Sequence, residues 1–246
     1  MAIEHLILVF IAFLLGGVMK GAVGAGAPIL AVPIMAILVD VPFAVAVFLV
    51  PNIVSNGLQI WRYRADFPDR KFTWSFALSG VVGAGIGTYA LARLDSDLLI
   101  SVVAAVVLFY VAFRLWKPSW KLAWPVACRL AAPVGGLGGV FQGAIGMSAP
   151  VSVTFTNAIQ FERKPFIAVM ALYFFSMTWM QLPAQLLFDI MTMERFYYSL
   201  LATIPMVLGM PLGNWLVRHI SRQTFDRAIL VLLTVLAVRL LIQALS

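Results

Sequence analysis

Long apolar stretches occupy most of the chain and limit it to one broad class of fold. Most of them run for roughly 17 to 24 residues between short polar loops, the length that an α-helix needs to cross about 30 Å of hydrocarbon. Apolar residues make up 63% of the 246 residues and charged residues only 11%, too little polar surface for a soluble domain of this size. The period-two alternation of a membrane β-barrel is absent. We therefore predict an all-α integral membrane protein, a helical bundle.

Ten apolar segments are predicted, five in each half of the chain. They cover residues 3–19, 28–39, 42–60, 72–92, 98–116, 125–142, 149–159, 165–188, 196–217 and 225–244. The second and seventh are short for a crossing, so each is expected either to span or to pair with its predecessor as a broken or re-entrant helix. The first lacks the basic leading region of a signal peptide, and we keep it as a retained span.

A glycine-rich motif follows the first segment and returns after the sixth. GGVMKGAVGAGAP, residues 16–28, matches GGVFQGAIGMSAP, residues 138–150, at eight of thirteen positions. Further matches follow in order, Pro42-Phe43 with Pro165-Phe166 and the glycine pattern from Gly83 with that from Gly209. We therefore predict an internal duplication, with a first repeat over residues 1–117 and a second over 118–246.

The basic residues indicate how the chain crosses the membrane. Most Lys and Arg residues fall in the loops 61–71, 114–124, 161–165 and 218–227, whereas only Arg93, Arg195 and Arg239 would lie on the opposite side. The positive-inside rule places the basic loops in the cytoplasm and both termini outside. Each half then crosses an odd number of times, so the second repeat is expected to be inverted relative to the first, as in many secondary transporters.

The first copy of the motif has the composition of an anion site at a broken helix. Gly21, Gly24 and Gly26 permit positive φ and close approach of the backbone to a ligand. Pro28 suits the first turn of a new helix, at whose start anions bind to free N–H groups. Those N–H groups would belong to Ala25, Gly26 and Ala27. Glycine repeats also permit close packing of helices, which is the alternative interpretation.

The second copy is expected to build the inverted counterpart of this site. Its residues would be Gly143, Gly146, Met147, Ser148 and Pro150, with the Ser148 hydroxyl acting as an N-cap or as a ligand.

Lys20 adds a full charge to the first copy, at the position where the second copy has Gln142. A lysine deep in a bilayer costs a few kcal/mol or more unless it meets water, a partner or an anion. We predict that Lys20 neutralises a bound anion. The alternative is that it lies in an ordinary cytoplasmic turn and extends its amine to water.

Other polar side chains inside the segments are candidates for lining the same pocket. Asn52 and Asn56 stand one helical turn apart on the third segment, and Trp179 lies on the eighth. Together with Gln142 they are expected to shape the substrate pocket. Amide side chains also bridge membrane helices, and that role remains open for each of the amides.

The residues that other functions would need are missing from the spans. All ten carboxylates fall at or near predicted span ends or in loops, so neither a proton relay nor a sodium site has an evident carrier. The two histidines, His5 and His219, lie at span ends, and the single cysteine, Cys128, is expected to be a small buried side chain. We therefore expect no metal, no cofactor and no nucleic-acid partner, and an intramembrane enzyme is the less favoured class.

The repeated motif beginning at Gly16 and Gly138 resembles that of the TauE/SafE group of sulfite and organosulfonate exporters, also called the toluene-sulfonate uptake permease family. This resemblance implies a transporter of sulfite, sulfoacetate or other sulfonates in the bacterial inner membrane. Family members often carry consecutive glycines where this chain has residues 24–27 and 146–149. The anion would bind between the two halves and be released as one half rocks against the other, although a channel on the same fold is the alternative.

Overall fold

The computed structural model describes residues 3–116, 120–217, 219, 231–236, 238–239 and 242, and its regular secondary structure there is entirely helical. The helices are α1 (Ile3–Val23), α2 (Ala27–Leu38), α3 (Val41–Tyr63), α4 (Arg70–Arg93), α5 (Ser96–Trp116), α6 (Trp124–Ile145), α7 (Ala149–Ala158), α8 (Arg163–Leu187) and α9 (Met193–Leu216). Each of the first nine predicted segments corresponds to one of these helices. The tenth, 225–244, lies largely outside the described residues.

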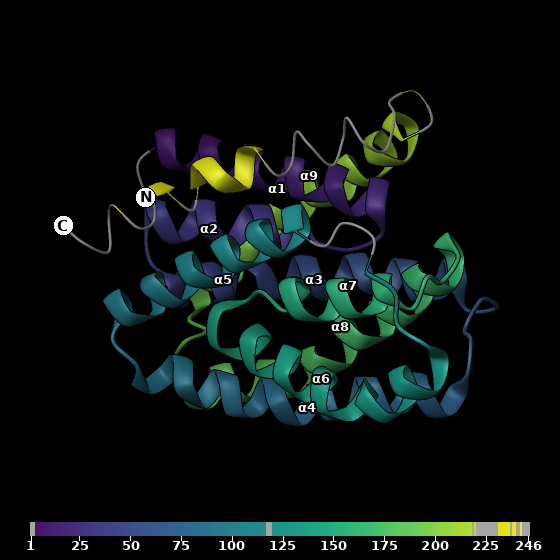
Figure 1. The fold of residues 1–246 in the computed structure, drawn as a ribbon. Helices are drawn as coiled ribbons and strands as arrows, with labels where there is room; N and C mark the ends of the chain where they lie inside the picture. The colour runs from purple at the N-terminus through teal and green to yellow at the C-terminus, as the bar shows by residue number, and fades with distance from the viewer. Residues whose placement is uncertain are drawn as a thin grey trace.

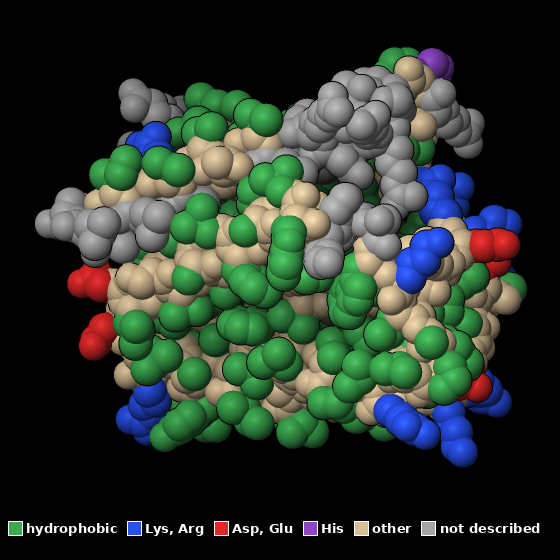
Figure 2. Space-filling model, viewed as in Figure 1, with side chains coloured by type: hydrophobic (Ala, Val, Ile, Leu, Met, Phe, Trp, Pro, Cys, Tyr) green, Lys and Arg blue, Asp and Glu red, His purple; other side chains and the backbone are tan. Residues whose placement is uncertain are grey.

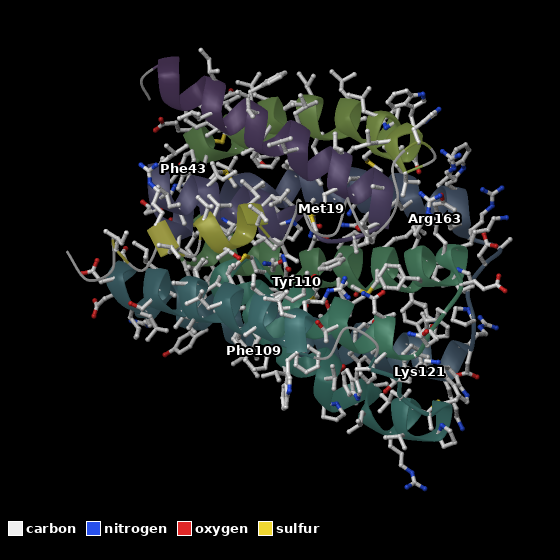
Figure 3. The ribbon with its side chains drawn as sticks, turned by 45° about the horizontal axis from the view of Figure 1, so that its top comes forward. Met19, Phe43, Phe109, Tyr110, Lys121 and Arg163 are labelled. Carbon is white, nitrogen blue, oxygen red and sulfur yellow. The ribbon has the colours of Figure 1, made fainter. Side chains whose placement is uncertain are left out.

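The bundle has the surface of a multi-pass membrane protein. Helices α3, α4, α5, α8 and α9 are each long and apolar enough to cross a bilayer. On the face seen in Figure 2, apolar side chains cover the middle, and charged side chains gather toward the two ends. Arg163 and Lys121 lie at one end and Phe43 at the other (Figure 3). We call the first the basic end; the helix termini and loops there carry Arg62, Arg64, Arg70, Lys71, Lys121, Arg163 and Lys164.

The short helices α2 and α7 fold back beside the helices that precede them. At 1.5 Å per residue their 12 and 10 residues cover about 18 and 15 Å, less than the bilayer core. Gly16 of α1 lies opposite Ala27 and Ala31 of α2, and Gly138 of α6 lies opposite Ser148 and Ser152 of α7. The turns 24–26 and 146–148 therefore lie inside the bundle.

Two helix pairs with very close backbones form opposite edges of the molecule. Figure 1 shows α1 with α9 at one edge and α4 with α6 at the other, and the remaining labelled helices lie between them. A Cβ atom on Gly17 would overlap the carbonyl oxygen of Met206, and one on Gly139 would overlap that of Gly80. The glycines are therefore required for the two contacts, which each join a helix of the first half to one of the second.

Part of the conformational prediction for the glycine motif is wrong. Gly21 and Gly143 are helical, and a Cβ atom on either would overlap a carbonyl oxygen of the neighbouring helix. Helix packing, rather than a turn, accounts for these two. Positive φ occurs at Gly24 (93°), Gly26 (92°) and Gly146 (69°). Because α1 continues as far as Val23, Lys20 lies within its last turn.

A buried serine of α9 compensates for a proline inside α3. Pro51 has no N–H, which leaves the carbonyl of Val47 without its helical partner. The hydroxyl of Ser199 donates to that carbonyl at 2.8 Å and accepts from the N–H of Val50 at 3.0 Å. This contact holds the part of α3 that precedes Asn52 and Asn56.

Cys128 is exposed, so the expectation of a buried cysteine is wrong. Cys128 lies near the start of α6, where Ala127 is buried but the neighbouring side chains are exposed.

Candidate functional site

Lys20 is buried between three helices without an opposite charge. Its side chain is 2% exposed, and its Nζ donates to Oδ1 of Asn56 on α3 at 2.6 Å. The same nitrogen lies 5.9 Å from the ring centroid of Phe174 on α8. Among the described residues, no carboxylate lies within ion-pairing distance of it. Lys20 is therefore not a loop lysine that reaches water, and its charge faces only neutral groups.

Asn52 and Asn56 extend this site along α3. The Nδ2 of Asn56 donates to the backbone carbonyl of Asn52 at 2.7 Å and to its Oδ1 at 2.6 Å. The Nδ2 of Asn52 is buried and has no partner among the described residues. Buried donors are normally satisfied by protein, water or a ligand. Lys20, Asn52 and Asn56, which we call the Lys20 cluster, thus present more donors than acceptors, the balance that suits an anion.

The turn 24–26 places further donors at the start of α2. Pro28 occupies the first turn of α2, as predicted. The N–H of Gly24 is bonded to the Lys20 carbonyl at 2.7 Å, whereas those of Ala25, Gly26 and Ala27 meet no acceptor in the part of the chain that the structure describes. The helix dipole adds positive potential at this point. Gln59 Nε2 donates to the carbonyl of Gly24 at 3.1 Å and so ties the turn to the face of α3 that carries the cluster.

The second break differs in its backbone, because Ser148 has φ −82° where Gly26 has φ 92°, and two of its donors are occupied. The N–H of Met147 is bonded to the carbonyl of Phe141 at 3.4 Å, and the N–H of Ser148 donates to Oε1 of Gln142 at 3.2 Å. Ser148 stands at the N-cap position, yet its hydroxyl bonds to Ser152 at 3.1 Å rather than to the helix N–H groups. Its oxygen is also 3.2 Å from the Tyr173 hydroxyl. The Gln142 amide oxygen therefore takes the place that an anion would have at the first break.

The structure separates the predicted site residues into two groups and leaves one apart. Lys20, Asn52 and Asn56 share one cluster, with the turn 24–26 held beside it on α3, whereas Gln142 and residues 146–148 form the second break. Trp179 belongs to neither, because its side chain is 72% exposed and packs on Phe175. It does not line the pocket. The interior position on this part of α8 belongs to Gln181, whose Nε2 donates to the carbonyl of Gln142 at 3.1 Å.

An open cleft at the basic end was not predicted from the sequence. Its volume is about 500 Å³, and it is lined by Gly21, Leu58, Gln59, Trp61, Arg62, Tyr63, Arg163, Ile167, Val207, Met210, Pro211, Asn214 and Trp215. Gln59 could have been found, because it continues the Asn52 and Asn56 face by one turn. Arg163 could not, since its partners Gly21 and Asn214 are 142 and 51 positions away.

The cleft reaches the turn of the first break. Gln59 lines the cleft and also holds the Gly24 carbonyl, and the side chain of Ile167 packs directly against Gly24. In Figure 3, Met19, the neighbour of Lys20, lies at mid-length of the bundle between Phe43 and Arg163. The basic end is therefore connected to the region of the Lys20 cluster. Among the described residues, no group of His, Cys, Asp and Glu is arranged to hold a metal ion.

A family model described as sulfite exporter TauE/SafE matches residues 8–240. The match includes both copies of the glycine motif, the Lys20 cluster and every residue that lines the cleft. No curated protein and no solved structure matches the chain.

Proposed function

The chain belongs to the sulfite exporter TauE/SafE family, which makes it a membrane transporter of sulfite- or sulfonate-type anions and not an enzyme, and we propose that the anion binds at the Lys20 cluster. We place the protein in the bacterial inner membrane with its basic end in the cytoplasm, as the positive-inside rule favours. The proposed substrates are sulfite, sulfoacetate or another small sulfonate.

The burial of Lys20 without a carboxylate carries this proposal. An isolated buried charge is costly unless a counter-charge accompanies it, and removal of one partner from a buried pair costs about 3–5 kcal/mol. A sulfite or sulfonate group would supply the missing charge. Its oxygens would accept from Lys20 Nζ, from the free Asn52 Nδ2 and from the unpartnered N–H groups at the start of α2.

We further propose that only the first of the two breaks binds an anion. The two breaks come from the same repeated motif, but the Gln142 side chain already occupies the Ser148 N–H of the second. The substrate site is therefore expected to be single and asymmetric, although the scaffold around it is duplicated.

The helix packing supports an inverted repeat. Contact between α1 and α9 corresponds, under exchange of the halves, to contact between α6 and α4, and contact of α3 with α9 corresponds to that of α8 with α4. Such a scaffold favours alternating access, with the cleft as the route from the cytoplasm. With no carboxylate at the Lys20 cluster among the described residues, facilitated flux or anion exchange fits better than a carboxylate-driven pump.

The test combines binding and flux for Lys20→Met and a matched control, Lys121→Met, which removes an equal charge from the exposed basic end. Calorimetry with sulfite, sulfoacetate and an acetate control should show binding of a sulfur anion that is at least tenfold weaker in Lys20→Met and unchanged in Lys121→Met. Equal affinity in both variants would remove Lys20 from the site. A channel would give flux in proteoliposomes that neither saturates nor accelerates with anion on the opposite side.

A further inference from the structure

We propose that the cleft at the basic end is a second anion site, one that binds organic sulfonates by their organic part as well as by their acid group. It takes its substrate class from the proposed function, but it is distinct from the Lys20 cluster. The acid group would bind to Arg163 and Arg62, and the organic group would pack on the apolar wall.

The charge of the cleft favours an anion. Two guanidinium groups, Arg62 and Arg163, line it, and no carboxylate does. The Nη2 of Arg163 donates to the carbonyl of Gly21 at 3.1 Å and to Oδ1 of Asn214 at 2.8 Å. Its Nε and Nη1 make no hydrogen bond to the described residues. The Nη2 contacts fix the plane of the guanidinium and leave the Nη1 N–H groups free to donate to an oxyanion.

The walls of the cleft favour an organic group. Apolar and aromatic side chains make up most of the lining, namely Leu58, Trp61, Tyr63, Ile167, Val207, Met210, Pro211 and Trp215. Arginine beside aromatic rings and apolar surface is the usual composition of a site for an amphipathic ligand. Sulfite has no apolar part, and it would leave this wall to water.

The size of the cleft also favours an organic sulfonate. About 500 Å³ is the space of roughly 17 water molecules at about 30 Å³ each. Sulfite would fill a small fraction of it, whereas an aryl or alkyl sulfonate would displace much of that water from apolar surface, which is favourable. The volume falls within the range of about 300–1,000 Å³ typical of small-molecule sites.

The cleft site precedes the Lys20 cluster on the route inward. Gly21 lines the cleft and directly follows Lys20 in α1, and Gln59 stands one turn from Asn56 on α3. An organic sulfonate held at Arg163 would therefore lie between the cytoplasm and the inner site. The affinity of the cleft would depend on the organic group, whereas the Lys20 cluster would recognise the oxyanion.

The experiment is calorimetry on the full-length protein in nanodiscs of neutral phosphatidylcholine. The probes are benzenesulfonate, sulfite and benzenesulfonamide, an uncharged analogue of the first. We expect benzenesulfonate to bind at least tenfold more tightly than either of the others. Arg163→Gln should remove that advantage, whereas Arg93→Gln, the same change at the opposite end of α4 from the basic end, should retain it.

A second variant guards against loss of fold in Arg163→Gln, since that arginine also bonds to α1 and α9. Val207→Trp fills the cleft from its wall and leaves every guanidinium in place. This variant should weaken the binding of benzenesulfonate at least tenfold and leave the binding of sulfite unchanged. Equal binding of benzenesulfonate and sulfite to the natural chain, or unchanged benzenesulfonate binding in both folded variants, would overturn the proposal.

Two further measurements distinguish this proposal from a lipid headgroup site and from the Lys20 site. If nanodiscs with anionic phosphatidylglycerol abolish benzenesulfonate binding, and native mass spectrometry detects a retained lipid that Arg163→Gln loses, the cleft is a lipid headgroup site and the proposal is wrong. Lys20→Met distinguishes the two anion sites. Loss of sulfite with retention of benzenesulfonate supports both sites, whereas retention of both ligands contradicts the Lys20 site alone.

Discussion

Gly17 of α1 lies so close to the carbonyl oxygen of Met206 in α9 that a Cβ atom on the glycine would overlap that oxygen. Gly139 of α6 stands in the same relation to Gly80 of α4. In both pairs a helix that carries the repeated motif is joined to the fourth helix of the other half. Backbone contacts this close depend on the absence of a side chain, and single substitutions can therefore test them.

Gly139→Ala should destabilise the protein by about 1–3 kcal/mol, because the new methyl group meets backbone atoms that cannot move aside. Gly136→Ala on the same helix is the control, since its Cβ would have Ser79 O, at 3.7 Å, as its nearest neighbour. Thermal unfolding of both variants in one detergent measures the difference. Equal melting temperatures would contradict the close contact of α4 and α6.

Lys20→Met should raise the melting temperature of the ligand-free protein while it abolishes stabilisation by a sulfur anion. Replacement of a buried charge without a charged partner by an apolar side chain of similar length removes a desolvation cost. Thermal shift assays with and without sulfite measure both effects, with Lys121→Met as the control. A less stable ligand-free variant would show that the lysine is compensated in the empty protein.

Gln142→Lys should change the stoichiometry of sulfite binding from one ion to two. The substitution removes the amide oxygen that occupies the Ser148 N–H and places a cation where the first break has Lys20. Gln160→Lys adds the same charge at an exposed position and should keep a stoichiometry of one. The measurement is calorimetry with sulfite, which is not expected to fill the apolar cleft; two sulfite ions bound to the natural chain would contradict the asymmetry of the breaks.

Ser199→Ala should cost about 1–3 kcal/mol, because the carbonyl of Val47 would be left buried without a donor. Ser101→Ala is the comparison, since that hydroxyl bonds within its own helix at an exposed position. Chemical or thermal unfolding provides the measurement. If the two variants were equally stable, another group would have to satisfy the Val47 carbonyl.

Cysteine labelling tests the orientation in the membrane. In a Cys128→Ser background, Asp97→Cys should react with an impermeant maleimide from outside the cell, and Asp66→Cys only after permeabilisation. Asp97 is exposed in the first turn of α5, and Asp66 is partly exposed in the loop between α3 and α4. The reverse pattern would place the basic end outside.

The sequence predicted the helices well because their signals are local. Apolar length, Pro28 and the break at the glycines are all read within one segment, and the structure places helix ends within a few residues of the prediction. The roles of individual glycines depend on helices that are distant in the sequence. Gly21 and Gly24 look alike in the motif, yet Gly21 is helical and packs on Met210 of α9, whereas Gly24 adopts positive φ and packs on Ile167 of α8.

The site was predictable only where residues share a helix face. Asn52 and Asn56 could be paired from their spacing, and the same rule extended by a turn gives Gln59. For Trp179 the rule was insufficient, since a polar segment of α8 does not show which of its sides meets lipid. Arg163 was counted as a topological signal, and its contact with the end of α1 depends on the folded chain.

The crossed helix pairs decide which parts of this transporter can move. Each glycine-mediated contact joins a helix of the first repeat, residues 1–117, to a helix of the second. The two repeats therefore cannot move apart as rigid bodies without breaking both contacts. The packing instead groups α1, α2, α3 and α9 on one side and α4, α6, α7 and α8 on the other, each group assembled from both repeats. Their seam runs between α3 and α8, beside Lys20, and Arg163 of α8 bridges it at one end through hydrogen bonds to α1 and α9.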